Sequence, residues 1–208
     1  MKFGFLLFPD AEELDFIGPW EIIGMWGKSF GGPEQRILVS QMDEIIQCAK
    51  GLRVVTDCRF EDCPPLDYLL IPGGQGTRRE VSNSELVGFV KKQASICQQV
   101  LSVCTGAFIL EAAGLLRGKN ATTHWASLNR LRQLSGVRVV EERVVRDGNI
   151  WTAAGISAGI DLALALIADQ AGEETAGEVQ LATEYYPSHR KYGNAHLSPE
   201  APAYLKTS

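Results

Sequence analysis

Short apolar runs alternate along the chain with segments in which apolar residues recur every three or four positions. The apolar runs predict strands over residues 1–8, 35–40, 54–56, 68–71 and 99–103, with a possible hairpin near 47–51. A second hairpin is expected over 137–145 and 149–153, because the Asp147-Gly148 pair between these segments is a strong turn signal.

Helical spacing follows most of these strands. The first helix is expected to begin at Asp15, with Pro19 in its first turn and Ile22, Ile23 and Trp26 on one face. Further helices are predicted over residues 83–97, 105–116, 125–134, 156–171 and 174–185. Alternating strands and helices predict an α/β fold with a mostly parallel sheet flanked by helices, in a single domain that covers 1–208.

Composition narrows the class of protein. The 208 residues are 45% apolar and 22% charged, which excludes a disordered, collagen-like or coiled-coil chain. A net charge of -5 argues against a nucleic-acid partner. The apolar runs are far shorter than the ~20 residues of a membrane span. The first run ends at Pro9 and Asp10, too early for a signal peptide, so we expect a cytoplasmic protein with no membrane partner.

The cysteines and histidines do not form a ligand pattern. No CxxC pair occurs among the five cysteines, which are Cys48, Cys58, Cys63, Cys97 and Cys104. Without a secretion signal they are expected to be reduced thiols in the core or at the surface. The histidines at 124, 189 and 196 are scattered, and the last two lie in a polar tail. We expect no bound metal.

Two strand ends carry unusual residues. Ligands of open α/β sheets bind beyond the carboxyl ends of the strands. Residues 68–71 are followed by Pro72-Gly73-Gly74, and residues 99–103 by Cys104-Thr105-Gly106. A cysteine between a strand and a helix lies at a helix N-terminus, which favours a thiolate nucleophile at neutral pH. The alternative is a small buried core cysteine.

These residues belong to a larger set of motifs that resembles the DJ-1/PfpI superfamily over nearly the whole chain. The motifs are GFLLFP (4–9), LDFIGP (14–19), DCPPLD (62–67), IPGG (71–74), SVCTG (102–106), ATTHW (121–125), ERVVRDGN (142–149) and GISAGID (155–161). The resemblance is strongest to the isocyanide hydratase branch. It implies a flavodoxin-like sandwich and cofactor-free addition of water to an isocyanide, which gives an N-substituted formamide through a thioimidate on Cys104.

The resemblance also implies roles for other residues. It assigns the acid–base role to Asp15, whose alternative role is that of a helix N-cap. It implies that the N–H groups of Gly74 and Thr105 stabilise developing charge, that the Thr105 hydroxyl orients water, and that Ile156 lines the pocket near Cys104. Relatives usually form homodimers close to the active site, often through the first helix. We therefore expect a homodimer through residues 15–26, with Trp20 or Trp26 in the contact.

The remaining polar candidates receive structural interpretations. Glu12 and Glu13 are expected to be solvated turn residues, and His124 a structural residue rather than a catalytic base. Asp161, one turn inside a predicted helix, is expected to interact with the helix dipole. The hydratase pattern often has Thr where this chain has Ile17, which alters the polarity of the pocket.

Two other functions stay open at this stage. Thr105 stands where the peptidase branch carries its catalytic His, so a Cys–His protease or amidase is disfavoured. A DJ-1-like enzyme acting on glyoxals or glycated thiols is one alternative. The other is a redox sensor in which Cys104 oxidises to a sulfinate beside Asp15.

Overall fold

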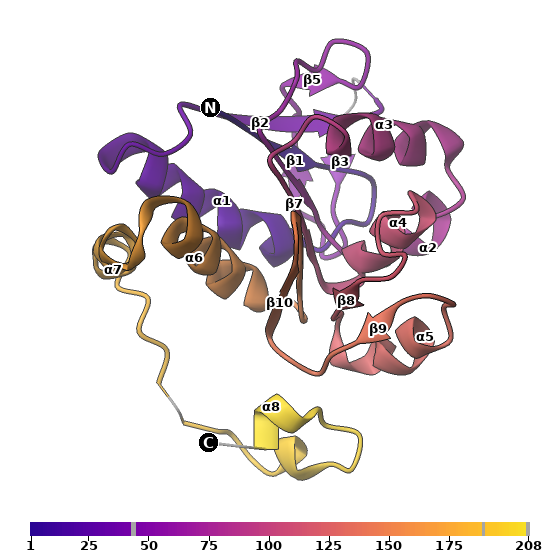
Figure 1. Cartoon of the computed structure of the whole chain (residues 1–208), viewed down its shortest axis with the longest axis vertical. Helices are drawn as coiled ribbons and strands as arrows, with labels where there is room; N and C mark the ends of the chain where they lie inside the picture. The colour runs from indigo at the N-terminus through magenta and orange to yellow at the C-terminus, as the bar shows by residue number, and fades with distance from the viewer. Residues whose placement is uncertain (43–44, 189, 207–208) are drawn as a thin grey trace.

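The computed structural model describes residues 1–42, 45–188 and 190–206, and one seven-stranded sheet forms its centre (Figure 1). The strand order is β10-β11-β7-β6-β1-β2-β5. These strands are Lys2–Leu6 (β1), Gln35–Ser40 (β2), Cys58–Arg59 (β5), Tyr68–Ile71 (β6), Gln99–Val103 (β7), Val144–Asp147 (β10) and Ile150–Ala153 (β11). Neighbouring strands are parallel except for the antiparallel β10–β11 hairpin. The predicted α/β fold with a mostly parallel sheet is confirmed.

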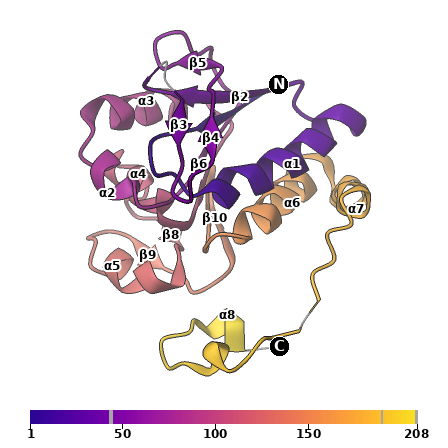
Figure 2. The same ribbon diagram turned by 180° about the vertical axis from the view of Figure 1, so that it is seen from behind.

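Helices cover both faces of this sheet. One face carries α1 (Glu13–Ser29), α6 (Ala158–Ala171) and α7 (Glu173–Ala182), and the other carries α2 (Thr77–Glu80), α3 (Ser84–Ala94) and α4 (Ala107–Ala112). Figure 2 shows the same two layers from behind. A short α5 (Leu128–Arg132) follows, and the C-terminal segment returns toward it through α8 (Ala203–Lys206).

The alternation of side chains along each central strand builds two separate cores. In β1 and the residues after it, Phe3 and Phe5 pack with α1 and α6, whereas Leu6 and Phe8 pack with α3 and α4. Strands β6 and β7 alternate in the same way. Because these parallel strands are buried on both faces, nearly all of their residues are apolar. The continuous apolar runs in the sequence therefore predicted the strands.

Several predicted boundaries are wrong. Helix α1 begins at Glu13, so Pro19 lies in its second turn and leaves the Asp15 carbonyl without its usual helical partner. The helix expected over 105–116 is a 3₁₀ turn, Cys104–Gly106, followed by the short α4. The first strand of the 137–153 hairpin is divided: β9 (Arg138–Val139) pairs with β8 (Asn120–Ala121), and only β10 pairs with β11.

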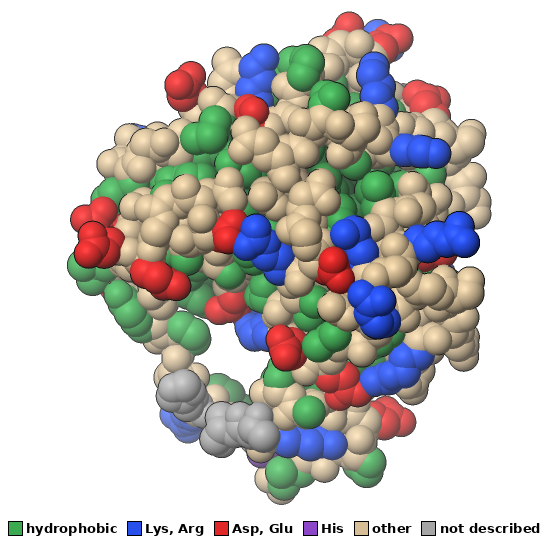
Figure 3. Space-filling view, in the orientation of Figure 1, with side chains coloured by type: hydrophobic (Ala, Val, Ile, Leu, Met, Phe, Trp, Pro, Cys, Tyr) green, Lys and Arg blue, Asp and Glu red, His purple; other side chains and the backbone are tan. Residues whose placement is uncertain are grey.

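Elements of two to four residues are too short to produce a periodic pattern. The sequence analysis therefore missed β5, β8 and α2. The hairpin near 47–51 is confirmed by β3 (Ile46–Gln47) and β4 (Arg53–Val54), although the strand expected at 54–56 ends at Val54. Within the described ranges, no helix is long and apolar enough to cross a membrane. Acidic and basic side chains are interspersed on the face shown in Figure 3.

Candidate active site

The carboxyl ends of three adjacent strands meet at one edge of the sheet. Strand β1 leads to α1 with Asp15, β6 leads to Gly73, and β7 leads to Cys104. From β1 the chain continues to β2 on one side, while β6 pairs with β1 on the other side. The site therefore lies at the switch point of the sheet, where open α/β folds bind ligands.

Cys104 has a constrained backbone. Its φ of 55° lies in the left-handed region, which costs a non-glycine residue about 1–3 kcal/mol. Two hydrogen bonds hold this conformation: the Cys104 N–H donates to the Ala154 carbonyl at 2.9 Å, and its carbonyl accepts from the Thr123 hydroxyl at 2.7 Å. The residue is only 6% exposed, so the thiol has a fixed direction in a nearly closed site.

Gly73 allows the loop after β6 to approach this thiol. A Cβ at position 73 would lie 2.5 Å from the Thr105 nitrogen and 2.8 Å from Cys104 Cβ, so a larger residue would force the loops apart. The Gly73 N–H donates to Asp15 Oδ2 at 2.7 Å. This one residue therefore joins the loop of Cys104 to the carboxyl group of Asp15.

Asp15 is fully buried and interacts with the Cys104 thiol. Burial raises the pKa of its carboxyl group well above the usual value of 3.8, and the hydrogen bond from Gly73 only partly opposes this. Because Oδ2 already accepts the Gly73 N–H, a proton on the carboxyl group belongs on Oδ1, which has no other hydrogen-bond partner. The N-cap alternative for Asp15 is wrong, since Glu12 occupies that position and Asp15 lies inside the helix.

The surroundings of Cys104 also raise its pKa, to about 12, through burial and the nearby Asp15 charge. Hydrogen bonds from the Thr105 N–H and hydroxyl lower it in part. The expectation that the helix terminus would give a thiolate at neutral pH is therefore not supported. The helix after Cys104 has only six residues, and burial is the largest influence on the pKa of the Cys104 thiol.

Thr105 takes part in a network with two residues of the β6–α2 segment. The Gly74 N–H donates to Thr105 Oγ1 at 3.0 Å. This N–H was expected to stabilise negative charge that develops on the substrate, but here its partner is the Thr105 hydroxyl. The Thr77 hydroxyl donates to the Gly74 carbonyl at 2.8 Å and lies 3.1 Å from Thr105 Oγ1. Thr77 is 1% exposed, and sequence reasoning missed it because a hydroxyl residue after a glycine turn carries no distinctive signal.

Glu12 and Glu13 are not solvated turn residues. Glu12 forms an ion pair with Lys50, and Glu13 Oε1 accepts the Lys50 N–H at 2.6 Å. The turn of the β3–β4 hairpin therefore folds onto the start of α1, a long-range contact that no local pattern indicates.

The other candidates have structural partners. His124 Nδ1 accepts the Ala126 N–H at 3.3 Å, and burial lowers its pKa, in line with a structural role. Asp161 forms an ion pair with Arg143, at 2.6 Å. Ile156 lies two residues after Ala154, whose carbonyl accepts the Cys104 N–H, and its contact with Cys104 stays a prediction. His189 lies outside the described residues.

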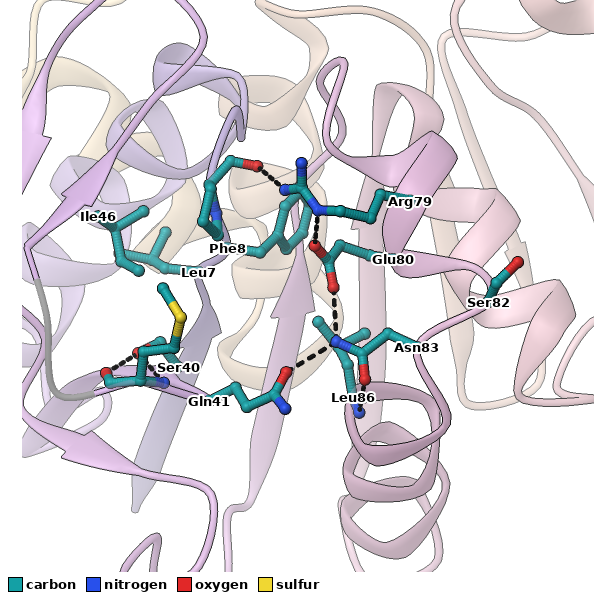
Figure 4. A pocket seen from close by; sticks show the side chains of 12 residues that line it. Leu7, Phe8, Ser40, Gln41, Ile46, Arg79, Glu80, Ser82, Asn83 and Leu86 are labelled. Carbon is teal, nitrogen blue, oxygen red and sulfur yellow. Dashed lines mark hydrogen bonds and ion pairs between the residues drawn. The ribbon is translucent and has the colours of Figure 1, made fainter.

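A separate pocket lies on the other side of α2 (Figure 4). Its volume is about 470 Å³, and its lining includes Leu7, Phe8, Ile46 and Leu86 but neither Cys104 nor Asp15. Four of its polar side chains are joined: Asn83 lies between Gln41 and Glu80, and Glu80 binds Arg79. Across the described part of the chain, no group of three or more His, Cys, Asp or Glu side chains is arranged to hold a metal.

Comparisons with known proteins agree with this geometry. The model of the DJ-1/PfpI family matches residues 1–169. Isonitrile hydratase from Pseudomonas putida is 41% identical over 189 residues, which cover 90% of this chain and 80% of that protein. The HTH-type transcriptional regulator GbdR of Pseudomonas aeruginosa is 28% identical over 178 residues, or 85% of this chain and 48% of the regulator.

A solved structure extends the similarity to three dimensions. The crystal structure of a ThiJ/PfpI family protein from Pseudomonas syringae superimposes with a TM-score of 0.86 and 32% identity. The match covers 99% of this chain and 83% of that one. With the strained cysteine, its carboxyl partner and the family match in agreement, the chain belongs to the DJ-1/PfpI family.

Proposed function

We propose that this protein is an isonitrile hydratase, which adds water to R–N≡C and releases an N-substituted formamide. The buried Asp15–Cys104 pair is the observation that carries the proposal. The reaction needs a nucleophile for the terminal carbon of the isocyanide and an acid that can protonate the same carbon. The similarity to the Pseudomonas putida isonitrile hydratase supports the assignment.

In the first step Cys104 Sγ forms a bond to the isocyanide carbon. The thiol proton passes to Asp15 while the Asp15 proton moves to that carbon, which gives the thioimidate R–N=CH–S–Cys104. Both groups start neutral, as their raised pKa values favour, and no free thiolate has to accumulate. Asp15 ends the step protonated, so it is ready for the next proton transfer.

In the second step water adds to the thioimidate carbon. Asp15 gives its proton to the nitrogen and accepts one from the attacking water, which forms R–NH–CH(OH)–S–Cys104. The hydroxyl proton then passes by way of Asp15 to sulfur as the carbon–sulfur bond breaks, and R–NH–CHO and the Cys104 thiol are released. A carboxyl group held in one place can serve both steps, since each needs a proton moved by a short distance.

Neighbouring residues orient this pair. We assign the Thr105 N–H to the Cys104 sulfur and the Thr105 hydroxyl to the attacking water. Gly74, whose N–H binds Thr105 Oγ1, keeps that hydroxyl in place. Ile156 and the half-exposed Ile17 supply apolar surface for the R group, so an aliphatic or aromatic substituent suits the entrance better than a charged one.

We also propose a homodimer through α1. The expected contact is wrong for Trp26, which is 2% exposed, whereas Trp20 is partly exposed, with Phe5 and Arg36 against its ring, and its contact stays a prediction. Leu14 and Ile17 instead expose 40% and 39% of their surface beside the active site. Ile17→Asp is expected to shift the protein from about twice the chain mass to the chain mass in light scattering, and an unchanged mass would contradict this interface.

The proposal also covers the domain organisation of the protein and its location in the cell. We treat residues 1–208 as one cofactor-free domain that acts in the cytoplasm, because all five cysteines are free thiols, as a reducing compartment favours.

A substrate panel tests the proposed activity. The protein is incubated with aliphatic and aromatic isocyanides, and formamide is quantified; methylglyoxal consumption and peroxide-dependent mass gain are measured in parallel. We expect formamide formation that depends on Cys104. Turnover of methylglyoxal without any formamide would indicate a glyoxal-type enzyme, and oxidation of Cys104 with neither activity would indicate a redox sensor.

A further inference from the structure

The turn of the β3–β4 hairpin is bound by the first residue of α1. Glu13 Oε1 accepts the Lys50 N–H at 2.6 Å and the Leu52 N–H at 3.4 Å. The other carboxyl oxygen, Oε2, is buried as well. The carboxyl group of Glu13 therefore occupies the turn, and Figure 2 shows the hairpin beside the start of the helix.

We propose that Glu13 is a positioning residue for the reaction at Cys104. By holding the hairpin turn, it fixes the segment that places the Asp15 carboxyl group against Gly73. This inference rests on the proposed function, because it assigns Glu13 a role in the proton transfers of that reaction. It requires a continuous set of contacts that leads from the hairpin to the Asp15 carboxyl group.

The first contacts join the hairpin to the segment before α1. The Ala49 N–H donates to the Ala11 carbonyl at 2.9 Å, and the Asp10 N–H donates to the Gln47 carbonyl at 2.9 Å. Together with the ion pair and the carboxyl contact described above, these bonds attach every residue of 10–13 to the hairpin.

The same segment is bound on its other side by the loop after β6. The Glu12 N–H donates to the Gly73 carbonyl at 2.9 Å. Ala11 pairs with Gly74 in an antiparallel bridge, and a Cβ at Gly74 would lie 2.3 Å from the Asp10 carbonyl oxygen, so the two backbones are in close contact. The segment therefore lies between the hairpin and this loop.

Gly73 connects this arrangement to the acid–base group. Its carbonyl accepts the Glu12 N–H and its own N–H donates to Asp15 Oδ2 at 2.7 Å, so one residue binds the first turn of α1 at two points. Within the described ranges, the side chain of the N-cap residue Glu12 makes no capping hydrogen bond. The backbone contacts and the hairpin therefore fix the start of α1, and a shift of the hairpin would move Asp15 relative to Cys104.

The backbone before α1 also has to be held in place. Asp10 has a φ of 63°, in the left-handed region, which is unfavourable for a residue other than glycine and persists only where surrounding contacts impose it. Its N–H is bound by Gln47 of the hairpin, and its carbonyl accepts the Gly76 N–H at 3.1 Å. Loss of the Glu13 contacts would weaken the hairpin side of this arrangement.

Kinetics of Glu13 variants test the inference. Glu13→Ala removes both acceptor oxygens from the turn, so kcat for formamide formation should fall about tenfold with KM nearly unchanged, because a misplaced reacting group slows the chemical step. Glu13→Gln keeps an oxygen that can accept the two N–H groups and should recover most of the rate. A role in stability alone would lower the melting temperature of Glu13→Ala and leave kcat unchanged below it. That result would overturn the proposal, as would an equal loss of kcat in Glu13→Gln.

Two matched variants separate the carboxyl contact from the effect of charge. Lys50→Ala removes the ion pair with Glu12 but keeps the N–H that Glu13 binds, so kcat should stay within about threefold of wild type. Glu21→Ala removes an exposed carboxyl group from the same helix and should leave kcat unchanged. A loss in Lys50→Ala equal to that in Glu13→Ala would assign the effect to the ion pair and overturn the role of Glu13.

A second measurement needs no isocyanide. Hydrogen exchange of the Gly73 amide reports on its bond to Asp15, and exchange of the Leu101 amide in β7 reports on the stability of the whole sheet. Relative to Leu101, we expect Glu13→Ala to raise the Gly73 exchange rate at least tenfold and Glu13→Gln to change it little. If the wild type forms no formamide, the proposed function fails, but this ratio still decides whether Glu13 holds Asp15 in place. An unchanged ratio in Glu13→Ala would overturn the inference.

Discussion

Cys104 and the two cysteines Cys58 and Cys63 place the same functional group in two different surroundings. Cys104 is nearly buried, has a strained backbone and faces a carboxyl group across the loop of Gly73. Cys58 and Cys63 lie near the edge of the sheet and are partly exposed, and burial raises the pKa of both thiols. Burial and a neighbouring carboxyl group therefore distinguish the surroundings of Cys104 from those of the thiols at the rim of the sheet.

The largest effect is expected from removal of the nucleophile. Cys104→Ala should lower formamide formation by more than about a thousandfold, since the covalent step has no other attacking group. Steady-state kinetics with one isocyanide measures this, with circular dichroism as the folding control. Residual turnover of more than a few per cent would remove the covalent intermediate from the mechanism.

The next largest effect on turnover is expected from replacement of the Asp15 carboxyl group. Asp15→Asn keeps the shape of the side chain but cannot exchange a proton, so kcat should fall by about a hundredfold or more. Alkylation of Cys104 should persist in this variant, because the thiol remains. Near-wild-type turnover would return the acid–base question to Glu13, His124 or solvent.

Asp15 should also affect stability in a pH-dependent way. Its pKa is raised by burial in the folded state, so above the unfolded value of 3.8 the unfolded chain ionises while the folded protein keeps its proton. The free energy of unfolding of the wild type should therefore decline, relative to Asp15→Asn, as pH rises from about 4 to 7. Urea unfolding at several pH values measures the difference, and a constant difference would mean that the carboxyl pKa is ordinary.

Thr77 is expected to give a smaller change. We treat it as a positioning residue, because its hydroxyl connects the Gly74 carbonyl to the Thr105 hydroxyl. Loss of such a hydrogen bond costs about 1 kcal/mol, so Thr77→Val should lower kcat about fivefold and leave KM nearly unchanged. Thr77→Ser should recover most of the rate; if it does not, the methyl packing of Thr77 matters more than its hydroxyl.

The smallest effect is expected at the sheet edge. Cys58→Ser should leave isocyanide turnover within about twofold of wild type, because no described contact links this thiol to the Asp15–Cys104 pair. The same assay as for Cys104→Ala checks this. A large loss would mean that the two thiol regions are coupled through the sheet.

Local sequence patterns were sufficient for the central architecture. Buried strands such as Tyr68–Ile71 and Gln99–Val103 are apolar on both faces, and α3 carries its apolar residues on one face and begins at an Asn83 cap. Since these signals are local and repeat over several residues, they survive in a single sequence. The Cys104-Thr105-Gly106 and Pro72-Gly73-Gly74 motifs likewise indicated the strand ends at which the site forms.

Tertiary structure alone decided the properties of that site. The sequence suggested a thiolate because it shows the helix after Cys104 but not the burial around it, and burial raises the pKa of this thiol. The ion pair of Glu12 with Lys50 and the network of Thr77 with Thr105 join segments far apart in the chain. The motifs therefore indicated which residues lie at the site and which strands they follow. Their charge states and hydrogen-bond partners depend on desolvation and on long-range hydrogen bonds, which only the packed structure provides.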